Sequence, residues 1–448
     1  MLSRRLALGL TAAATLGLCA RPSRCFSAAP PAAAAAAPAM PAFPKPPGTA
    51  RILLTGDVML GRGVDQILPH HCDPVLYEAC VRDARAYVRL ATDANGPLPA
   101  DRPAAYPWGV ALNDMQDKAP DARIINLETA VTTNDEPWPS KGINYRMHPG
   151  NVATITAAGV DVCALANNHV LDWEEEGLLE TLDTLHGAGL LTAGAGRDLA
   201  EAEAPAVVPL PPSAAVDPAS GAAQPGRLLV WAIGHGSSGV FDSWAAGQRR
   251  PGVALADLSP AGVAHVAQLV ARHKRPGDIA LVSVHWGSNW GFEVPKEHRR
   301  FAHALSDEAG VDVVHGHSSH HAKGAEVYKG RLLLYGCGDL ISDYEGIMNY
   351  EIESHYPPEM YRDDVGVLWY ADVSTADGRL RQLTMTPTRL KHLSLHHPEP
   401  ADWQYISRTL DRECRKLGGS RGVGAVPGSG SLMLQLDEGA EAGGRREE

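Results

Sequence analysis

Short apolar runs rich in β-forming residues alternate with helical stretches along the chain, and this alternation constrains the fold more than any other feature. The β-type runs cover residues 51–57, 122–128, 160–169, 278–287 and 311–317. The helical patterns cover residues 173–189, 260–274 and 295–310. Chains that alternate in this way form layered α/β folds. Two later runs, 330–339 and 365–374, come without helices, and we expect them to form a second, more antiparallel sheet.

Each of the five β-type runs ends in polar side chains. These are Asp57, Glu128, Asn168 with His169, His285, and the four histidines of residues 315–321. Ligands of α/β sheets bind at the carboxyl ends of strands, so we expect these side chains to converge. Carboxylate, amide and imidazole groups suit Zn, Mn, Fe or Mg, either singly or as a pair of ions. A cap, a turn or a packed histidine explains each residue alone, but five such placements favour a shared metal site.

Charge and cysteine content exclude other functions. The 448 residues carry a net charge of −12, and non-specific nucleic-acid binding needs a basic surface, so no nucleic-acid partner is expected. Seven widely spaced cysteines fit neither a disulfide framework nor a Cys-rich zinc site. With nineteen histidines in the chain, a metal site is expected to use histidine and carboxylate ligands.

Composition also predicts the organisation of the chain. Residues 1–50 contain no Asp or Glu and combine arginines with an Ala/Pro-rich spacer, so we expect a targeting segment that directs the chain out of the cytosol. We favour an organellar, mitochondrial-type presequence, and the alternative is export or surface association. The apolar stretch 6–20 is too short to predict a membrane span. We expect one domain over 51–395, with a surface insertion at 204–226, and a mostly disordered tail over 396–448.

Several motifs, in order, resemble those of CapA-type proteins, which are named for poly-γ-glutamate capsule synthesis and belong to the calcineurin-like metallophosphoesterase superfamily. They are ILLTGDVMLGR, INLETAVT, ALANNHVLDW, GAGRDLAEA, VSVHWGSNW and HGHSSHHAKGAEVYKGRLLLYGCGDL. The resemblance covers roughly residues 51–345. It implies a four-layer α/β/β/α sandwich of two mixed sheets, with one or two divalent metal ions at the strand ends.

The resemblance also implies roles for individual residues. The implied metal ligands are Asp57 for the first ion, Glu128 for both, Asn168 and His285 for the second, and His317 and His320 for one each. His169 would donate a hydrogen bond or proton to the substrate, with Asp172 orienting its imidazole. His315 is expected to be packed or to support the ligands, and His321 to lie at the rim.

This chain departs from the superfamily at its first motif. The superfamily has Asp-x-His, but Met59 stands in place of the histidine, and a thioether is a poor ligand for these cations. The first ion is therefore expected to be weakly held or absent. CapA-type sequences have an arginine a few residues later, which Arg62 matches, and we expect Arg62 to present positive charge to an anionic substrate. Other charged residues are interpreted either as anion or supporting contacts or as loop residues: Lys141, Arg146, Arg197, Asp339 and Asp343.

These observations predict a metal-dependent hydrolase acting on a phosphoester or an anionic polymer, in capsule or poly-γ-glutamate synthesis or processing. Attack on phosphorus and attack on an amide carbonyl both remain open. The alternative is a non-catalytic polymer-binding or assembly protein that retains a degenerate metal site. The missing first-motif histidine favours that alternative, and the retained Asn168–His169 pair disfavours it.

Overall fold

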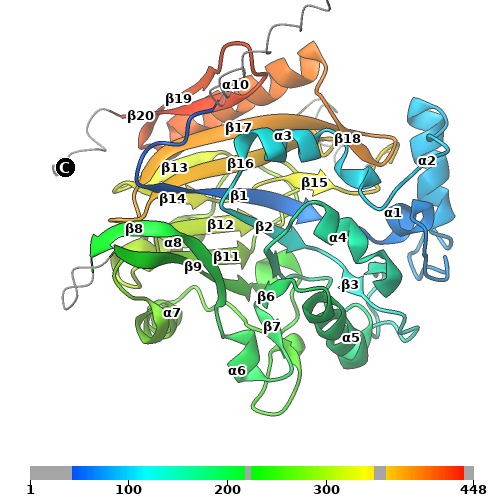
Figure 1. The fold of residues 1–448 in the computed structure, drawn as a ribbon. Helices are drawn as coiled ribbons and strands as arrows, with labels where there is room; N and C mark the ends of the chain where they lie inside the picture. The colour runs from blue at the N-terminus through cyan, green and yellow to red at the C-terminus, as the bar shows by residue number, and fades with distance from the viewer. Residues whose placement is uncertain (1–42, 217–222, 348–359, 438–448) are drawn as a thin grey trace, which may run out of the picture. The chain divides into compact units, whose positions relative to one another are not determined.

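The computed structural model describes residues 43–216, 223–347 and 360–437 (Figure 1). Its larger sheet has the strand order β19-β20-β17-β16-β1-β2-β5-β6, with β15 also paired to β1 and β18 to β17. The strands are β1 (Thr49–Val58), β2 (Ala122–Leu127), β5 (Val162–Ala164), β6 (Leu191–Ala193), β15 (Asp339–Ile341), β16 (Val365–Ser374), β17 (Leu380–Lys391), β18 (Ser394–His396), β19 (Ser420–Ala425) and β20 (Leu432–Leu436). Strand β1 is parallel to β2 and β15 and antiparallel to β16, so the sheet is mixed, as predicted.

A second mixed sheet has the order β13-β14-β12-β11-β9-β8. Its strands are β8 (Ala206–Val216), β9 (Ala223–Gly234), β11 (Ile279–His285), β12 (Val313–His317), β13 (Ala325–Tyr328) and β14 (Arg331–Leu334). The central strands β9, β11, β12 and β14 are parallel, which brings their carboxyl ends to one edge. Two small pairs complete the strands: β3 (Ala130–Val131) with β4 (Arg146–Met147), and β7 (Ala195–Gly196) with β10 (Gly252–Val253).

Helices cover the outer face of each sheet. The helices are α1 (Arg62–Ile67), α2 (Arg85–Asn95), α3 (Ala111–Lys118), α4 (Ala153–Ala157), α5 (Glu174–Gly187), α6 (Leu199–Ala202), α7 (Pro260–His273), α8 (Lys296–Asp307) and α10 (Pro400–Leu417). Side chains of α7 and α8 share a buried cluster with one face of the smaller sheet. The inner faces of both sheets and the apolar sides of α3, α4 and α5 contribute to the main core. The predicted four-layer α/β/β/α sandwich is therefore confirmed.

The two sheets are also joined by polar contacts in the interior. His315 on β12 lies with its Nε2 2.6 Å from the carbonyl oxygen of Thr55 on β1. Within the larger sheet, Arg51 on β1 forms a buried two-point ion pair with Asp372 on β16, at 2.8 and 2.9 Å. Such hydrogen-bonded pairs satisfy charges that would be costly if buried alone.

The prediction that the later strands form a separate antiparallel sheet is wrong. Strand β14 joins the smaller sheet, parallel to β12, and β16 joins the larger one, antiparallel to β1. The intervening β13 pairs antiparallel with β14 and serves as the crossover, so no helix is needed between β12 and β14. The residues at 204–226 also differ from a simple surface insertion, because β8 and β9 pair and form one edge of the smaller sheet.

The expected disordered tail is wrong for residues 400–436. Helix α10 buries Ile406, Leu410 and Cys414 in the main core, and β19 and β20 extend the larger sheet. The targeting segment and spacer lie outside the described residues, except for the last few residues before β1. Among the residues that the structure describes, no helix combines the length and apolarity of a membrane span.

Candidate metal centre

The backbone brings β1 and β15 into unusually close contact just before the first candidate ligand. Asp57 pairs with Asp339 in parallel register, and Asp57 N donates to Gly338 O at 3.0 Å. A Cβ atom added to Gly56 would lie only 1.5 Å from Gly338 O. Glycine at position 56 is therefore required for this approach, and the approach places two carboxylates side by side.

Asp57 and Glu128 are buried carboxylates with unsatisfied oxygens. Asp57 Oδ1 accepts a hydrogen bond of 2.8 Å from Asn126, but among the described residues neither Asp57 Oδ2 nor Glu128 Oε2 has a hydrogen-bond partner. Burial, reinforced by Asp339, raises the pKa of Asp57 to about 7. Burial and the neighbouring Asp57 raise the pKa of Glu128 well above its usual value. Buried acceptors without donors are costly, and a bound cation would satisfy them.

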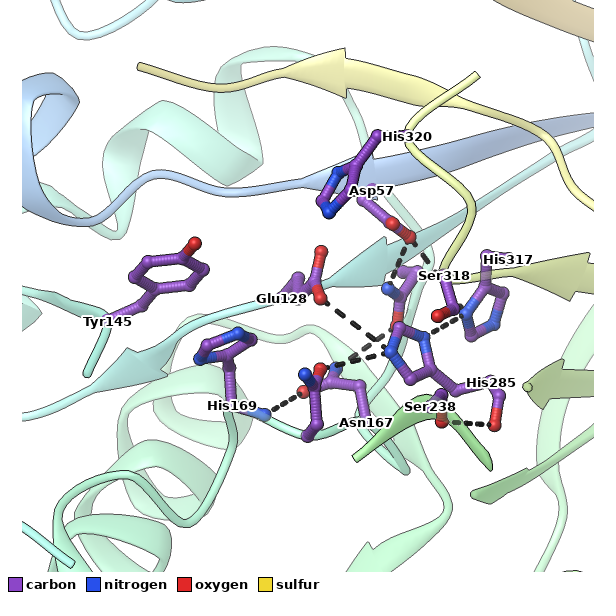
Figure 2. Close-up of polar contacts among 12 residues, drawn as sticks. Asp57, Glu128, Tyr145, Asn167, His169, Ser238, His285, His317, Ser318 and His320 are labelled. Carbon is purple, nitrogen blue, oxygen red and sulfur yellow. Dashed lines mark hydrogen bonds and ion pairs between the residues drawn. The ribbon is translucent and has the colours of Figure 1, made fainter. Parts of the chain in front are cut away.

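His285 and His317, from the ends of β11 and β12, face these carboxylates (Figure 2). Their Nδ1 atoms lie 2.7 Å apart, and His285 Nε2 lies 3.0 Å from the amide oxygen of Asn168 and 3.6 Å from Glu128. Burial lowers the pKa of both histidines well below its usual value, so both rings are neutral. Neutral imidazoles are the form that binds metal ions.

His320 completes a second group with Asp57 and Asp339. Its Nδ1 lies 2.9 Å from Asp339 Oδ2. Burial alone would lower the pKa of His320, but the Asp339 carboxylate outweighs it and raises the value to about 9. From the sequence, Asp339 is interpreted only as a supporting or loop residue, whereas the structure places it beside Asp57 and His320. Its motif follows an apolar run, as the other ligands do, and this was the signal that could have identified it.

These side chains form two groups that could each hold an ion. Asp57, His285 and His317 make one group and Asp57, His320 and Asp339 the other, with all candidate ligand atoms of a group within 4.8 Å of one another. Asp57 belongs to both groups, the position that the family resemblance gives to Glu128. Met59, which stands in place of the first-motif histidine, accepts a contact of 3.2 Å at Sδ from Gly61 N and belongs to neither group. The donor set is mixed oxygen and nitrogen, which fits Mn, Zn or Fe.

His169 lies beside the metal-ligand cluster with its ring held on both sides. Figure 2 shows Glu128 between the His285–His317 pair and His169. His169 Nδ1 lies 2.6 Å from Asp172 Oδ2, and the ring stacks on Tyr145 with 3.8 Å between centroids. Lys141 Nζ is 2.6 Å from the other Asp172 oxygen. Burial lowers the pKa of His169 to about 4, so the ring is neutral, with Nδ1 toward Asp172 and Nε2 left for another partner.

The expectation for Arg62 is not met. Its guanidinium is buried and bonded to Asp343 at two points, 3.1 and 2.5 Å, and to Glu78 at 2.8 Å. It also lies over the Tyr145 ring, 4.7 Å from the centroid. The charge of Arg62 is balanced by these two carboxylates, so Arg62 is not placed to bind an anionic substrate. Its contact with the Tyr145 ring, on which His169 stacks, gives it a supporting role. Asp343 is its partner.

Other charged candidates are also used within the protein. Lys141 pairs with Asp172, and Arg146 pairs with Asp135 and lies over Trp173 at 4.0 Å. Arg197 forms surface pairs with Asp183 and Glu201. His315 is packed, as predicted. The predicted rim position of His321 is wrong: the ring is buried and packs against Trp290, Phe292 and Tyr361 beside His320.

Comparison with known proteins identifies the family. The family model described as "Bacterial capsule synthesis protein PGA_cap" matches residues 51–344. The chain belongs to this capsule synthesis family. A probable polyglutamine synthesis accessory protein of Mycobacterium tuberculosis is 44% identical over 374 residues, covering 83% of this chain and 93% of that protein.

More distant members of the capsule synthesis family are also similar. The PGA biosynthesis protein CapA of Bacillus subtilis is 26% identical over 227 residues, covering 50% of this chain and 54% of its own. The capsule biosynthesis protein CapA of Bacillus anthracis is 23% identical over 298 residues, covering 65% and 59%. The family match ends at residue 344, so α10 and strands β16 to β20 lie beyond it.

Proposed function

We propose that this chain is a metal-dependent hydrolase that acts on a phosphoester or an anionic polymer in capsule or polyglutamate-type polymer synthesis. One observation carries the proposal. Three carboxylates, Asp57, Glu128 and Asp339, lie together in the interior beside three histidines, and two of their oxygens have no partner among the described residues. Burial and mutual repulsion disfavour the ionised forms of Asp57 and Glu128, and a bound cation would offset both effects.

The residues of the two groups would hold one or two ions. Asp57, His285 and His317 would hold one, and Asp57, His320 and Asp339 the other, with Glu128 and Asn168 at the same edge. A divalent ion in such a site supplies Lewis-acid polarisation and an activated water. With Nδ1–H donated to Asp172, the neutral His169 ring would accept a proton at Nε2, and in its protonated form the same nitrogen would donate a hydrogen bond or proton to the leaving group.

The names of relatives support a polymer as the substrate. One is called a polyglutamine synthesis accessory protein, and two are called PGA or capsule biosynthesis proteins. Together with family membership, this favours a substrate related to a cell-surface polymer. The metal centre is equally suited to a phosphoester of an intermediate or to an amide bond of the polymer.

The experiment compares metal content with turnover. We expect the purified protein to bind at least one equivalent of Mn, Zn or Fe, measured by elemental analysis, and to hydrolyse a phosphodiester or the polymer. His169→Ala should retain the metal and lose about 100-fold or more in turnover, because it removes the proton donor and no ligand. Less than about half an equivalent of metal, with no hydrolysis of either substrate, would overturn the proposal.

A non-catalytic assembly role is the second candidate, and Met59 favours it. The thioether contacts Gly61 N and leaves the first motif one ligand short of the superfamily pattern. An assembly protein would show no turnover, and the His169→Ala substitution would leave its affinity for polymer unchanged. His169→Ala therefore separates the two candidates through polymer binding and hydrolysis measured on the same samples.

We further propose that residues 1–50 direct the chain out of the cytosol, with an organellar presequence favoured over export. The absence of acidic residues and the arginines of this segment support the proposal. Mass spectrometry of the mature N-terminus tests it. A cut near Phe26 supports an organelle and a cut near Ala20 supports export, whereas an unprocessed chain in the cytosol would contradict both.

A further inference from the structure

A groove runs along one face of α10, outside the metal centre. It has a volume of about 570 Å³ and is open to solvent. Its lining from α10 repeats every three or four residues, which places one side of the helix along the groove. The lining residues are Phe292, Met360, Ala401, Gln404, Tyr405, Arg408, Thr409, Arg412, Glu413 and Lys416.

The groove is cationic on an acidic protein. Arg408, Arg412 and Lys416 are exposed and lie one helical turn apart, while Glu413 is the only acidic residue of the lining. Glu413 is buried and pairs with Arg412 and Lys416. Arg408 forms no ion pair with any residue in the described part of the chain. Three cations against one carboxylate leave an excess of two positive charges, whereas the whole chain carries −12.

Aromatic side chains connect the groove to the metal centre. Arg412 lies over the Phe292 ring at 4.8 Å, and Phe292 contacts the His321 ring at 4.6 Å between centroids. The neighbouring Trp290 lies 5.3 Å from the candidate ligand His320. A series of contacting rings, Phe292, His321 and Trp290, therefore runs from the α10 groove to His320.

We propose that the α10 groove binds an extended polycarboxylate chain and holds it beside the metal centre. Successive cations on α10 are about 6 Å apart along the axis, close to the ~6.8 Å between alternate residues of an extended peptide. Carboxylates on one side of such a chain would meet Arg408, Arg412 and Lys416 in turn. Binding of the polymer in the α10 groove does not depend on the proposed hydrolase activity. Only the statement that the bound polymer is the substrate rests on that proposed function.

Polymer binding by a charge-reversal pair tests the proposal. Fluorescence anisotropy of labelled polyglutamate would be measured with the full-length protein and with Arg408→Glu and Arg415→Glu. Arg415 is an exposed arginine on the same helix that pairs with Asp411 and lies outside the lining, so both variants have the same net charge. We expect Arg408→Glu to raise the Kd about fivefold or more and Arg415→Glu to leave it nearly unchanged.

Two further tests vary the length and the chemistry of the ligand. The three cations span about 12 Å, which an extended chain of about four residues covers, so glutamate itself should bind far more weakly than longer oligomers. Neutral polyglutamine should also bind weakly. Equal loss in both variants, equal affinity for polyglutamine, or tighter binding of polyphosphate of matched charge would each overturn the proposal.

The binding result can be separated from the proposed hydrolase. Turnover of the unmodified protein with metal is measured on its own, without the groove variants. Absence of turnover together with the expected Arg408 and Arg415 pattern would leave the groove standing and reject the hydrolase. Turnover by the unmodified protein, together with unchanged polymer binding by Arg408→Glu, would support the hydrolase and reject the groove.

Discussion

Asp339 adds a carboxylate to the candidate ligands Asp57 and His320, in a chain whose first motif has Met59 in place of a histidine. It reaches Asp57 because β15 pairs with β1 in parallel register, and it binds His320 at 2.9 Å. The convergence of the candidate ligands at the strand ends was predictable, because polar side chains follow successive apolar runs. The contact of Asp339 with Asp57 and the pairing of Arg62 were not, because both depend on which distant segments meet: Arg62 lies 281 residues from Asp343.

Replacing Asp339 by Asn should weaken binding of the ion shared with Asp57 and His320. The amide keeps the shape of the carboxylate but removes its charge, so we expect the affinity for metal to fall about 10- to 100-fold. Calorimetric titration with Mn or Zn measures the change. Asp307→Asn is the control, since Asp307 pairs with Lys329 at the surface. Unchanged metal affinity in Asp339→Asn would exclude Asp339 as a ligand.

Lys323, which belongs to neither candidate ligand group, allows a prediction of how stability depends on pH. It is buried, and burial lowers its pKa from 10.5 to about 8. The folded protein therefore disfavours the charged lysine: the penalty is complete below pH 8 and disappears as the pH rises from 8 to about 10.5.

Lys323→Met should consequently stabilise the protein at pH 7, by on the order of 2 kcal/mol. The advantage should shrink by pH 10, and chemical unfolding at both values measures it. A difference between the two proteins that stays constant from pH 7 to 10 would contradict the assignment.

At the scale of elements, the approach of β1 and β15 controls the metal centre. A methyl group at position 56 would overlap Gly338 O, so Gly56→Ala must push the two backbones apart. We expect a loss of about 3 kcal/mol in unfolding free energy together with weaker metal binding. Gly187→Ala, at the end of α5 with open space around it, is the control and should retain both properties. Normal metal binding by Gly56→Ala would show that the ligands do not depend on this contact.

Helix α10 tests how much of the C-terminal region belongs to the fold. Its few apolar residues are interspersed with many charged ones, and this pattern favours a disordered tail. In the structure Leu410 is fully buried. Leu410→Ala should cost about 3 kcal/mol, measured by chemical unfolding. Arg415→Ala, on the exposed side of the same helix, should change stability by less than about 0.5 kcal/mol. Similar stabilities for the two variants would mean that α10 does not pack on the core.

At the scale of the whole molecule, the sequence predicted the layers but not how the sheets are composed. Alternating strands and helices predicted the parallel parts of both sheets, because each helix returns the chain to the same edge. The antiparallel strands β16 to β20 and the edge hairpin of β8 and β9 have no such signal, since their partners are chosen by tertiary packing. The position of the candidate ligand cluster was predictable for the same reason as the parallel strands.

The long sequence separation within the larger sheet has a consequence for how the protein is made. Arg51 and Asp372 pair across 321 residues, and Asp57 meets Asp339 across a similar span. A ribosome adding about 5–20 residues per second takes roughly 15–60 s to bridge such a distance. Until then β1 has no partner on its β16 side, and the group of Asp57, His320 and Asp339 is incomplete. An ion held by this group would therefore bind only after residue 339 has been made, and a chain that crosses a membrane before folding would bind that ion at its destination.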